Sequence, residues 1–193
     1  GEERSSLDQS AETIRSNLEF LKKNDAFSGD VEDVLDRIQF TRDREASVGR
    51  ADWVFEALPE DPDLKQIFFE EANDYVSKET IVTSGSSTIS ITTLAEAYAH
   101  PEQLFITHWL NPAFIVPLVE VARTEETRED SVETITRVLE DVGKEPVVCR
   151  DSPGFIGSRI QAVAMNEAVR IIEEGVASPE QIDRAIKSGV GFR

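Results

Sequence analysis

The sequence predicts an α/β domain built on a largely parallel sheet and followed by helices alone. Two observations carry this prediction. Short apolar segments of strand length alternate with longer segments of helical spacing as far as Cys149, and after Cys149 only helical spacing is found. Strands that alternate with helices pack in layers around a parallel sheet. We therefore expect an α/β domain over residues 1–150 and the start of an all-α domain over residues 151–193.

Helices are expected where apolar residues recur every three or four positions. In the first helix, Leu7, Ile14, Leu18 and Leu21 are separated by polar residues and lie on one face. A later amphipathic helix ends at Gly143, a residue type that favours helix C-termini. The expected helices cover residues 7–24, 31–38, 64–76, 92–98, 127–142 and 156–174, with one more after Ser178.

Two of these helices have recognisable starts. Ser178 precedes Pro179, and a serine N-cap followed by proline at the first helical position is a common way to begin a helix. The helix over residues 92–98 should begin at Thr92 or Thr93, whose hydroxyl can accept a hydrogen bond from a free backbone N–H.

Strands are expected in short apolar runs bounded by turn-forming residues. The run that begins at Trp53 is broken by Pro59 and Pro62. The serine-rich loop SGSST and the segment RDSPGF turn the chain after two other runs. The expected strands cover residues 38–42, 53–57, 80–83, 104–108, 116–121 and 146–149.

The charge restricts the class of partner. Aspartate and glutamate number 38 against 20 lysines and arginines, so the formal net charge is -18. Such a charge argues against binding to nucleic acid or to an anionic membrane, because their phosphates would be repelled. It indicates either a well-solvated surface or adaptation to high salt, and the sequence leaves both open.

The sequence also bears on location. No apolar run approaches the roughly 20 residues of a membrane span, and the N-terminal segment GEERSSLDQS lacks a signal-peptide pattern. The single cysteine, Cys149, excludes an intramolecular disulfide and fits a reducing compartment. No zinc-type spacing or other metal cluster is found. We expect a cytoplasmic protein without a metal site.

His108 and Glu120 are the strongest candidates for chemistry. His108 closes the expected strand over residues 104–108, and strand ends in open α/β sheets face the ligand crevice. A neutral imidazole can accept a proton near pH 7, and a nearby carboxylate orients the ring. A returning strand would bring Glu120 beside His108. Spacing alone leaves open a structural histidine that bonds a backbone carbonyl and an unrelated surface glutamate.

Three other segments could contact a ligand, and each has a simpler explanation. Ser86 and Ser87 follow a strand, but the GxSxG elbow of serine hydrolases is absent and the loop also fits a capped turn. Glu60 and Lys65 lie beyond another strand, where cofactor contacts occur, or they belong to a solvated helix start. DSPGFIGSRI, which contains Ser158, can direct a helix N-terminus at a ligand or serve only as a domain joint.

Seven segments occur together in one order: FEALPEDPDLK, SGSST, THWLNP, PLVEV, DSPGFIGSRI, NEAVRIIEEGVASPEQIDRAI and GVGF. On these segments the chain, from Leu7 to Arg193, resembles the 3-hydroxyacyl-CoA dehydrogenase family, which includes 3-hydroxybutyryl-CoA dehydrogenases. The resemblance implies a partial Rossmann-type doubly wound sheet, followed by the first helices of an all-α C-terminal domain for substrate binding and dimerisation.

The resemblance also implies an activity. Family members oxidise a 3-hydroxyacyl-CoA to the 3-ketoacyl-CoA with NAD, or run the reverse, in fatty acid metabolism. The family's catalytic histidine falls on His108, which would take the hydroxyl proton while a hydride passes to NAD. Its partner glutamate falls on Glu120, which would orient the ring. The serine that bonds the substrate oxygen falls on Ser87.

Other site residues and partners follow from the same resemblance. Positions that contact NAD in relatives fall on Glu60, Lys65 and Asn111, and Ser87 joins them. The expected partners are a small-molecule substrate, preferably a 3-hydroxyacyl-CoA, and a second copy of the protein in a homodimer. No nucleic acid or membrane partner is expected.

Two departures from the family pattern concern the substrate. The asparagine of the family's GFxxNR motif, which polarises the substrate carbonyl, is replaced by Ser158. A serine hydroxyl can donate the same hydrogen bond over a shorter reach. Fatty-acid-oxidation members usually have lysine at the position of Pro117. In this respect the chain is closer to the carnitine and gulonate dehydrogenase branch. The substrate could therefore be a hydroxy acid without CoA.

A third departure concerns the cofactor. The sequence contains no GxGxxG, so the expected phosphate-binding turn is absent from this chain. The chain is expected to begin after the second Rossmann strand and to end before the remaining C-terminal helices, which would make NAD binding weak. The alternative to an enzyme is a non-catalytic protein, structural or binding, that keeps the fold, as in lens crystallins related to the family.

Overall fold

A five-stranded sheet forms the centre of the computed structural model, which describes the backbone of residues 2–192 and the side chains of residues 7–191. The strands lie in the order β1-β2-β3-β4-β5, and all neighbours are parallel except the antiparallel pair β3–β4. Their bounds are β1 Trp53–Glu56, β2 Ile81–Ser84, β3 Leu104–Trp109, β4 Leu118–Arg123 and β5 Glu145–Arg150. The predicted α/β class with a largely parallel sheet is confirmed.

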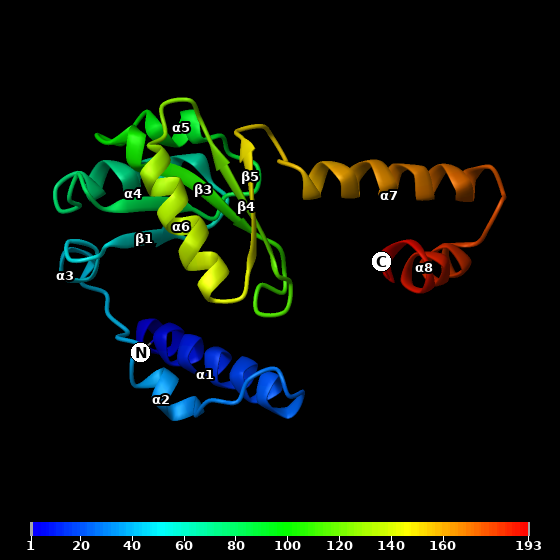
Figure 1. The fold of residues 1–193 in the computed structure, drawn as a ribbon, viewed down its shortest axis with the longest axis horizontal. Helices are drawn as coiled ribbons and strands as arrows, with labels where there is room; N and C mark the ends of the chain where they lie inside the picture. The colour runs from blue at the N-terminus through cyan, green and yellow to red at the C-terminus, as the bar shows by residue number, and fades with distance from the viewer. Residues whose placement is uncertain (1, 193) are drawn as a thin grey trace.

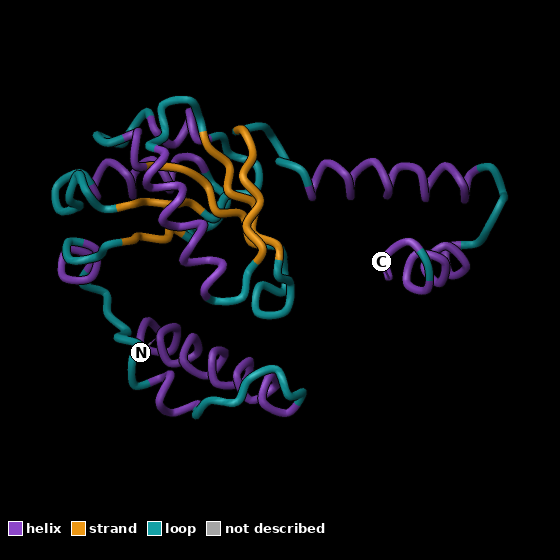
Figure 2. The backbone as a smooth tube through the Cα atoms, in the orientation of Figure 1, coloured by secondary structure: helices purple, strands orange, loops and turns teal. Residues whose placement is uncertain are grey.

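Helices surround this sheet and continue beyond it, as Figures 1 and 2 show. α4, α5 and α6 connect strands, and α1 and α2 precede the sheet as a pair in contact with each other. The α-helices are α1 Glu2–Lys23, α2 Val31–Leu35, α3 Arg44–Val48, α4 Pro62–Ala72, α5 Ile91–Ala95, α6 Glu129–Asp141, α7 Gly157–Glu173 and α8 Pro179–Ser188. Short 3-10 turns lie at η1 Pro101–Gln103 and η2 Val190–Phe192. Between residues 2 and 192, no helix combines the length and apolarity needed to cross a membrane.

β3 lies in the middle of the sheet and is buried on both sides. Leu104, Phe105 and Ile106 are all completely buried, although successive side chains of a strand point to opposite faces. Phe69 of α4 and Leu139 of α6 are buried in the same apolar cluster. Two covered faces explain why β3 is a continuous apolar run rather than an alternating one.

The structure corrects two local predictions. The strand expected over residues 38–42 does not form, and the unpredicted helix α3 follows directly. Here Asp43 accepts a hydrogen bond from the backbone N–H of Ala46, and Thr41 accepts one from Asp43. These side-chain bonds hold the backbone in a helix start instead of a strand ladder. For α5 the N-cap is Ser90, which lies before the two predicted threonines.

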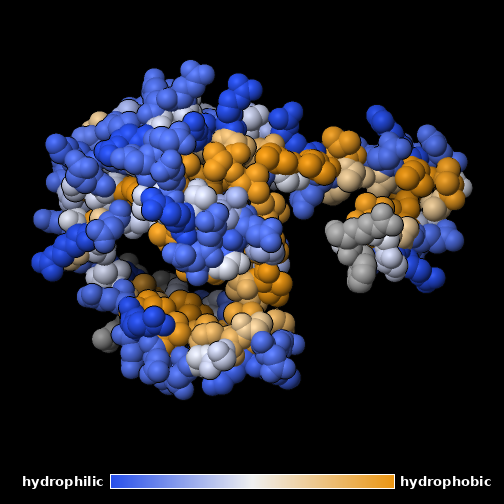
Figure 3. All heavy atoms as spheres, viewed as in Figure 1, coloured by the Kyte–Doolittle hydropathy of each residue, from blue (hydrophilic) through white to orange (hydrophobic). Residues whose placement is uncertain are grey.

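The C-terminal helices leave the sheet and extend to one side of it (Figure 1). Helical structure after Cys149 was predicted, and the N-cap Ser178 with Pro179 at the start of α8 is confirmed by a complete capping box with Gln181. Neither α7 nor α8 has a buried residue. Figure 3 accordingly shows apolar side chains along both helices.

Candidate active site

His108 and Glu120 meet across the antiparallel hairpin of β3 and β4. They are directly paired in the strand register, so their side chains leave the same face of the sheet. His108 Nδ1 lies 2.7 Å from Glu120 Oε2, and both residues are buried. The two side chains are therefore in contact, as expected from the sequence. The hairpin explains how residues twelve positions apart can pair.

The second oxygen of Glu120 binds the start of α7. Its Oε1 accepts hydrogen bonds of 2.8 Å from the backbone N–H groups of Ile156 and Gly157. A tight turn makes this possible, because Gly154 and Phe155 both adopt positive φ angles, 75° and 43°. Backbone N–H groups at a helix N-terminus stabilise a negative charge. Glu120 is thus fixed at both oxygens and presents an acceptor to Nδ1 of His108.

The other ring nitrogen of His108 faces Ser87. Its Nε2 lies 3.0 Å from Ser87 Oγ, while a carboxylate on Nδ1 favours the tautomer with the proton on Nδ1. In that tautomer Nε2 accepts, and the Ser87 hydroxyl donates. Ser87, His108 and Glu120 therefore form one hydrogen-bonded chain that runs from the buried strand β4 to the partly exposed loop after β2.

This order of groups is also that of a serine hydrolase, but the surrounding loop argues against a nucleophilic serine. Hydrolases need free backbone N–H groups beside the nucleophile to bind an oxyanion. Here the N–H groups of Ser87 and Thr88 donate to the carboxylate of Glu60, at 2.9 and 2.7 Å. A carboxylate at this place would repel an oxyanion. The arrangement favours a hydrogen-bonding role for Ser87.

Glu60, which lies in the loop after β1, binds the serine-rich loop that follows β2. Besides the backbone N–H groups of Ser87, Thr88 and Ile89, its Oε1 accepts hydrogen bonds from the hydroxyls of Ser86 and Thr88, at 2.7 and 2.8 Å. Burial would raise the pKa of Glu60, but the hydrogen bonds from Ser86, Thr88 and Ser87 outweigh it and lower the pKa to about 2. Glu60 therefore carries a negative charge at neutral pH, and its Oε2, which accepts none of these bonds, lies 3.8 Å from Lys65 Nζ.

Lys65, which was expected to contact NAD, is buried in an ion pair. Its Nζ donates to both oxygens of Glu56, at 2.8 and 2.9 Å, and to the carbonyl of Leu58 at 3.1 Å. Its side chain is 1% exposed, and Glu60 Oε2 lies 3.8 Å away. In this conformation the ammonium supports the loop after β1, and a direct contact with NAD stays a prediction.

The remaining two predicted residues lie next to the hydrogen-bonded chain. Asn111 follows β3 in the loop between β3 and β4; its side chain is exposed and forms no hydrogen bond with the part of the protein that the structure describes. Ser158 is the second residue of α7 and adjoins Gly157, which bonds Glu120. Its hydroxyl likewise has no partner among residues 2–192.

Three contributors were not expected from the sequence. Glu56 neutralises Lys65 and also accepts a 2.5 Å hydrogen bond from Ser84 Oγ. The backbone N–H groups at the start of α7 hold Glu120, and because nearly every residue type has such a group, the sequence does not mark them. The ring of Phe155 lies 5.3 Å from that of His108, between centroids. Only the unusual PGF turn in the sequence hinted at the last two.

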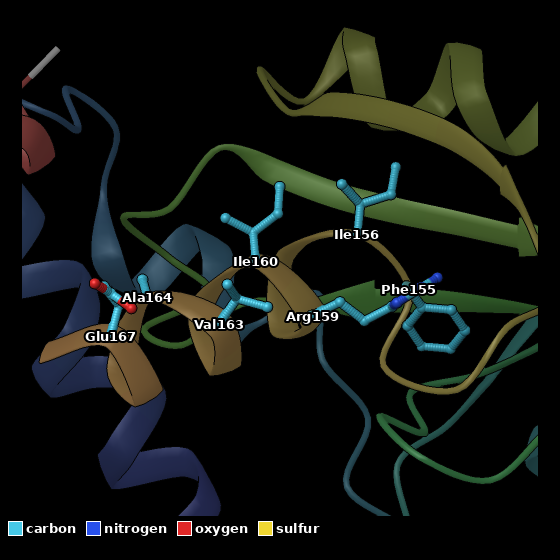
Figure 4. Close-up of a pocket in the computed structure, with 7 residues that line it drawn as sticks. All are labelled: Phe155, Ile156, Arg159, Ile160, Val163, Ala164 and Glu167. Atoms are coloured by element: carbon cyan, nitrogen blue, oxygen red, sulfur yellow. The ribbon is translucent and has the colours of Figure 1, made fainter. Parts of the chain in front are cut away.

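A groove of about 600 Å³ begins beside this site. Phe155 forms one end, and apolar side chains of α7 form its length, as Figure 4 shows. Arg159 and Glu167 are the charged residues that line it. Within residues 2–192 no group of three or more histidine, cysteine, aspartate or glutamate side chains is arranged to hold a metal ion.

Comparison with known proteins identifies the family. Residues 1–152 match the family model of the 3-hydroxyacyl-CoA dehydrogenase NAD binding domain, and residues 154–193 match the model of the C-terminal domain. The chain belongs to the 3-hydroxyacyl-CoA dehydrogenase family. NAD is accordingly the cofactor of the matched domain.

Two curated relatives from bacteria show the range of this dehydrogenase family. A probable 3-hydroxybutyryl-CoA dehydrogenase of Deinococcus radiodurans is 36% identical over 184 residues, which is 95% of this chain and 66% of the relative. A 5-formyl-3-hydroxy-2-methylpyridine 4-carboxylate 5-dehydrogenase of Mesorhizobium japonicum is 35% identical over 81% of this chain and 51% of the relative. The chain thus spans less than two thirds of either protein.

Solved structures support the same dehydrogenase fold. The 3-hydroxybutyryl-CoA dehydrogenase of Escherichia coli superposes with a TM-score of 0.87 at 33% identity, over 97% of this chain and 40% of that one. The predicted partial Rossmann-type sheet with helices of the C-terminal domain is confirmed.

The residues present fit part of an NAD molecule. β1, β2 and β3 are parallel, so the loops that carry Glu60, Ser87 and Asn111 leave the same edge of the sheet. Ligands of doubly wound sheets bind at this edge. The free amide of Asn111 and the second oxygen of Glu60 can bond the polar groups of a nicotinamide riboside. These residues belong to the NAD binding domain of the dehydrogenase family.

Proposed function

We propose that the protein that carries this chain oxidises the 3-hydroxyl of a 3-hydroxyacyl-CoA with NAD, or catalyses the reverse reduction. The observation that supports this most is the hydrogen-bonded chain from Ser87 through His108 to Glu120. It ends in a partly exposed hydroxyl at the edge of the sheet where the cofactor of such a fold binds.

In the proposed oxidation His108 acts as general base. Its Nε2 takes the proton of the substrate hydroxyl, while bound NAD supplies the acceptor for the hydride that leaves C3. Glu120 keeps Nδ1 protonated and offsets the positive charge that the ring gains. The two N–H groups of Ile156 and Gly157 keep Glu120 in place as that charge develops.

Two hydroxyls are proposed to hold the substrate. Ser87 is within hydrogen-bond distance of His108 Nε2, so it can donate to the same substrate oxygen that Nε2 deprotonates. Ser158, with no partner among the described residues, can donate to the carbonyl of the acyl group. Glu60 and Asn111 are proposed to contact NAD, and Lys65 to support Glu60.

The two histidines of the chain provide a matched test. His108→Ala should lower kcat for oxidation of 3-hydroxybutyryl-CoA by about 10²- to 10⁴-fold, because the proton acceptor is lost. His100→Ala should leave kcat unchanged, since His100 lies outside the site, where its half-buried ring packs against Tyr98 and lies 3.7 Å from Glu102. The measurement is NADH formation followed by absorbance, with circular dichroism to verify the fold. Equal kcat in the unaltered and His108→Ala proteins would reject the assignment.

A substrate without CoA is the second candidate. Pro117 and Ser158 favour it, and one relative of the chain is named for a pyridine carboxylate rather than a CoA ester. The same hydrogen-bonded chain would serve either substrate, because it acts on the hydroxyl alone. A panel of 3-hydroxyacyl-CoA esters and free hydroxy acids separates the two: turnover only with CoA esters would eliminate this candidate.

Domain organisation and assembly follow as part of the proposal. We place the boundary between the NAD domain and the helical domain near residue 150, where β5 ends and the chain turns towards α7. The apolar side of α7 suits a homodimer contact. A reducing, cytoplasmic location fits the free thiol of Cys149. A non-catalytic role would instead require that the intact protein turn over none of the hydroxy substrates, which the same substrate panel tests.

A further inference from the structure

Lys144 reaches from the turn between α6 and β5 to the loop over residues 110–117. Its ammonium donates to the carbonyls of Ala113, at 2.5 Å, and Val116, at 3.0 Å. It also lies 5.7 Å from the ring centre of Trp109, within the range of a cation–π contact. In a chain with 38 acidic residues, this cation bonds two backbone carbonyls instead of a carboxylate.

The backbone of Lys144 is itself well anchored. Its N–H donates to the carbonyl of Leu139 at the end of α6, and the next N–H, of Glu145, donates to the carbonyl of Pro117. Lys144 therefore stands on a rigid junction between a helix, β4 and β5. A charged donor fixed at its base can hold a loop carbonyl more firmly than a mobile surface lysine can.

The loop that Lys144 holds has few other contacts. Ile115 and Val116 donate their N–H groups to the carbonyl of Pro112, which makes a local turn. Phe114 packs edge-on against Phe20 of α1, with 6.1 Å between ring centroids. The side chain of Ile115 is 52% exposed. Apart from the bond that Pro117 accepts from Glu145 at the end of the loop, the two carbonyl bonds to Lys144 are the polar contacts that hold this loop against the rest of the domain.

This loop joins the two halves of the proposed site. It leaves β3 just after His108 and Trp109, and it enters β4 shortly before Glu120. The strand register holds His108 and Glu120 whatever the loop does, because both lie within the ladder. Asn111 lies outside the ladder and depends on the loop for its position.

We propose that Lys144 is a positioning residue that keeps the 110–117 loop, and with it Asn111, in the conformation that binds NAD. This inference rests on the proposed function, because the KM for NAD can be measured only if the protein is an NAD-dependent dehydrogenase. Because the ammonium of Lys144 is bonded to the carbonyls of Ala113 and Val116, we do not assign it a contact with the substrate or with NAD. Its removal should lower the fraction of protein with the loop in place, and apparent affinity falls in proportion to that fraction.

The test compares Lys144→Met, Lys144→Arg and Lys78→Met in the protein that carries this chain. Methionine keeps most of the apolar stem and loses the charge, arginine keeps the charge and the donors, and Lys78 is an exposed lysine away from the loop. For Lys144→Met we expect the KM for NAD to rise about tenfold with kcat within about twofold. The arginine variant should recover most of the affinity, and Lys78→Met should match the unaltered protein.

A second measurement does not depend on turnover. Hydrogen exchange followed by mass spectrometry should show faster exchange over residues 110–117 in Lys144→Met, and unchanged exchange over β3 and β4. An unchanged KM for NAD, or unchanged exchange in the loop, would overturn the inference. So would an equal fall in kcat, since Lys144 would then act on the chemical step.

The proposed function can fail separately. If the unaltered protein oxidises none of the hydroxy substrates, NADH titration replaces the KM measurement. Weaker NADH binding in Lys144→Met alone, with faster loop exchange, then supports the inference although the activity is wrong. Equal NADH binding in all variants overturns the inference, and no NADH binding by the unaltered protein overturns both.

Discussion

The β3–β4 hairpin and helix α7 differ sharply in how their side chains are covered. In the hairpin, Val119 and Val121 are completely buried, and both ring nitrogens of His108 have partners. In α7 no residue is buried, and Val163 and Met165 are 69% and 70% exposed. The hairpin is therefore specified by contacts within the chain. Helix α7 is held by its own backbone bonds and by its junction with Glu120.

The largest expected effect breaks the link between the two regions at Glu120. In Glu120→Gln the amide oxygen can keep accepting from α7, while its NH₂ faces His108 and donates to Nδ1. The ring proton then moves to Nε2, which can no longer act as base. We expect kcat to fall by about 10³- to 10⁴-fold with little change in thermal unfolding. A kcat within tenfold of the unaltered enzyme would show that the tautomer of His108 is unimportant.

The second prediction compares covered and uncovered apolar side chains. Leu104→Ala in β3 should lower the free energy of unfolding by about 2–5 kcal/mol, because a completely buried side chain leaves a cavity. Met165→Ala on α7 should change it by less than about 0.5 kcal/mol. Urea unfolding of both variants measures the difference. A cost for Met165→Ala as large as that for Leu104→Ala would mean that α7 is covered in solution.

The third prediction concerns the exposed end of the hydrogen-bonded chain. Ser87→Ala removes one neutral donor, so kcat/KM should fall by about tenfold. Ser77→Ala, at an exposed turn away from the site, is the matched control and should have no effect. The measurement is steady-state NADH formation with both substrates varied. A loss greater than 10³-fold would point to a catalytic role for Ser87 beyond hydrogen bonding.

The smallest expected effect is the pH dependence that Glu60 contributes. Its pKa is lowered from 4.5 to about 2 in the folded protein, so folding stabilises its charged form. This contribution is complete above about pH 4.5 and is lost as the pH falls towards 2. The difference in Tm between the unaltered protein and Glu60→Gln should therefore be largest near neutral pH and shrink below pH 4.5. Glu174→Gln, an exposed glutamate at the end of α7, should show no such trend.

Much of the fold could be predicted because apolar patterns determine strands and helices. The apolar run from Leu104 indicated a strand, and the position of Glu120 on the returning strand brought it beside His108. The strand expected over residues 38–42 failed because polar side chains there, such as Asp43, bond the backbone locally. Patterns of apolar residues carry no information about such bonds.

The parts of the site that escaped prediction depend on backbone groups or on burial. Two N–H groups bind Glu120, and no residue type marks a backbone donor. The pairing of Lys65 with Glu56 inside the protein was not expected, because the alternative to a cofactor contact was a solvated helix start. A single sequence does not tell a paired buried lysine from a solvated one.

The backbone character of the bonds to Glu120 has a consequence for sequence variation. Because the donors at Ile156 and Gly157 are main-chain N–H groups, the side chains at these positions can change without removing either bond. A Cβ added at Gly157 would meet no atom closer than 3.5 Å, so there is room for one. Proline is the residue that cannot serve at either position, since it has no N–H. The bonds to Glu120 therefore restrict Ile156 and Gly157 only by excluding proline, whereas the positive φ angle of Gly154 restricts that position separately.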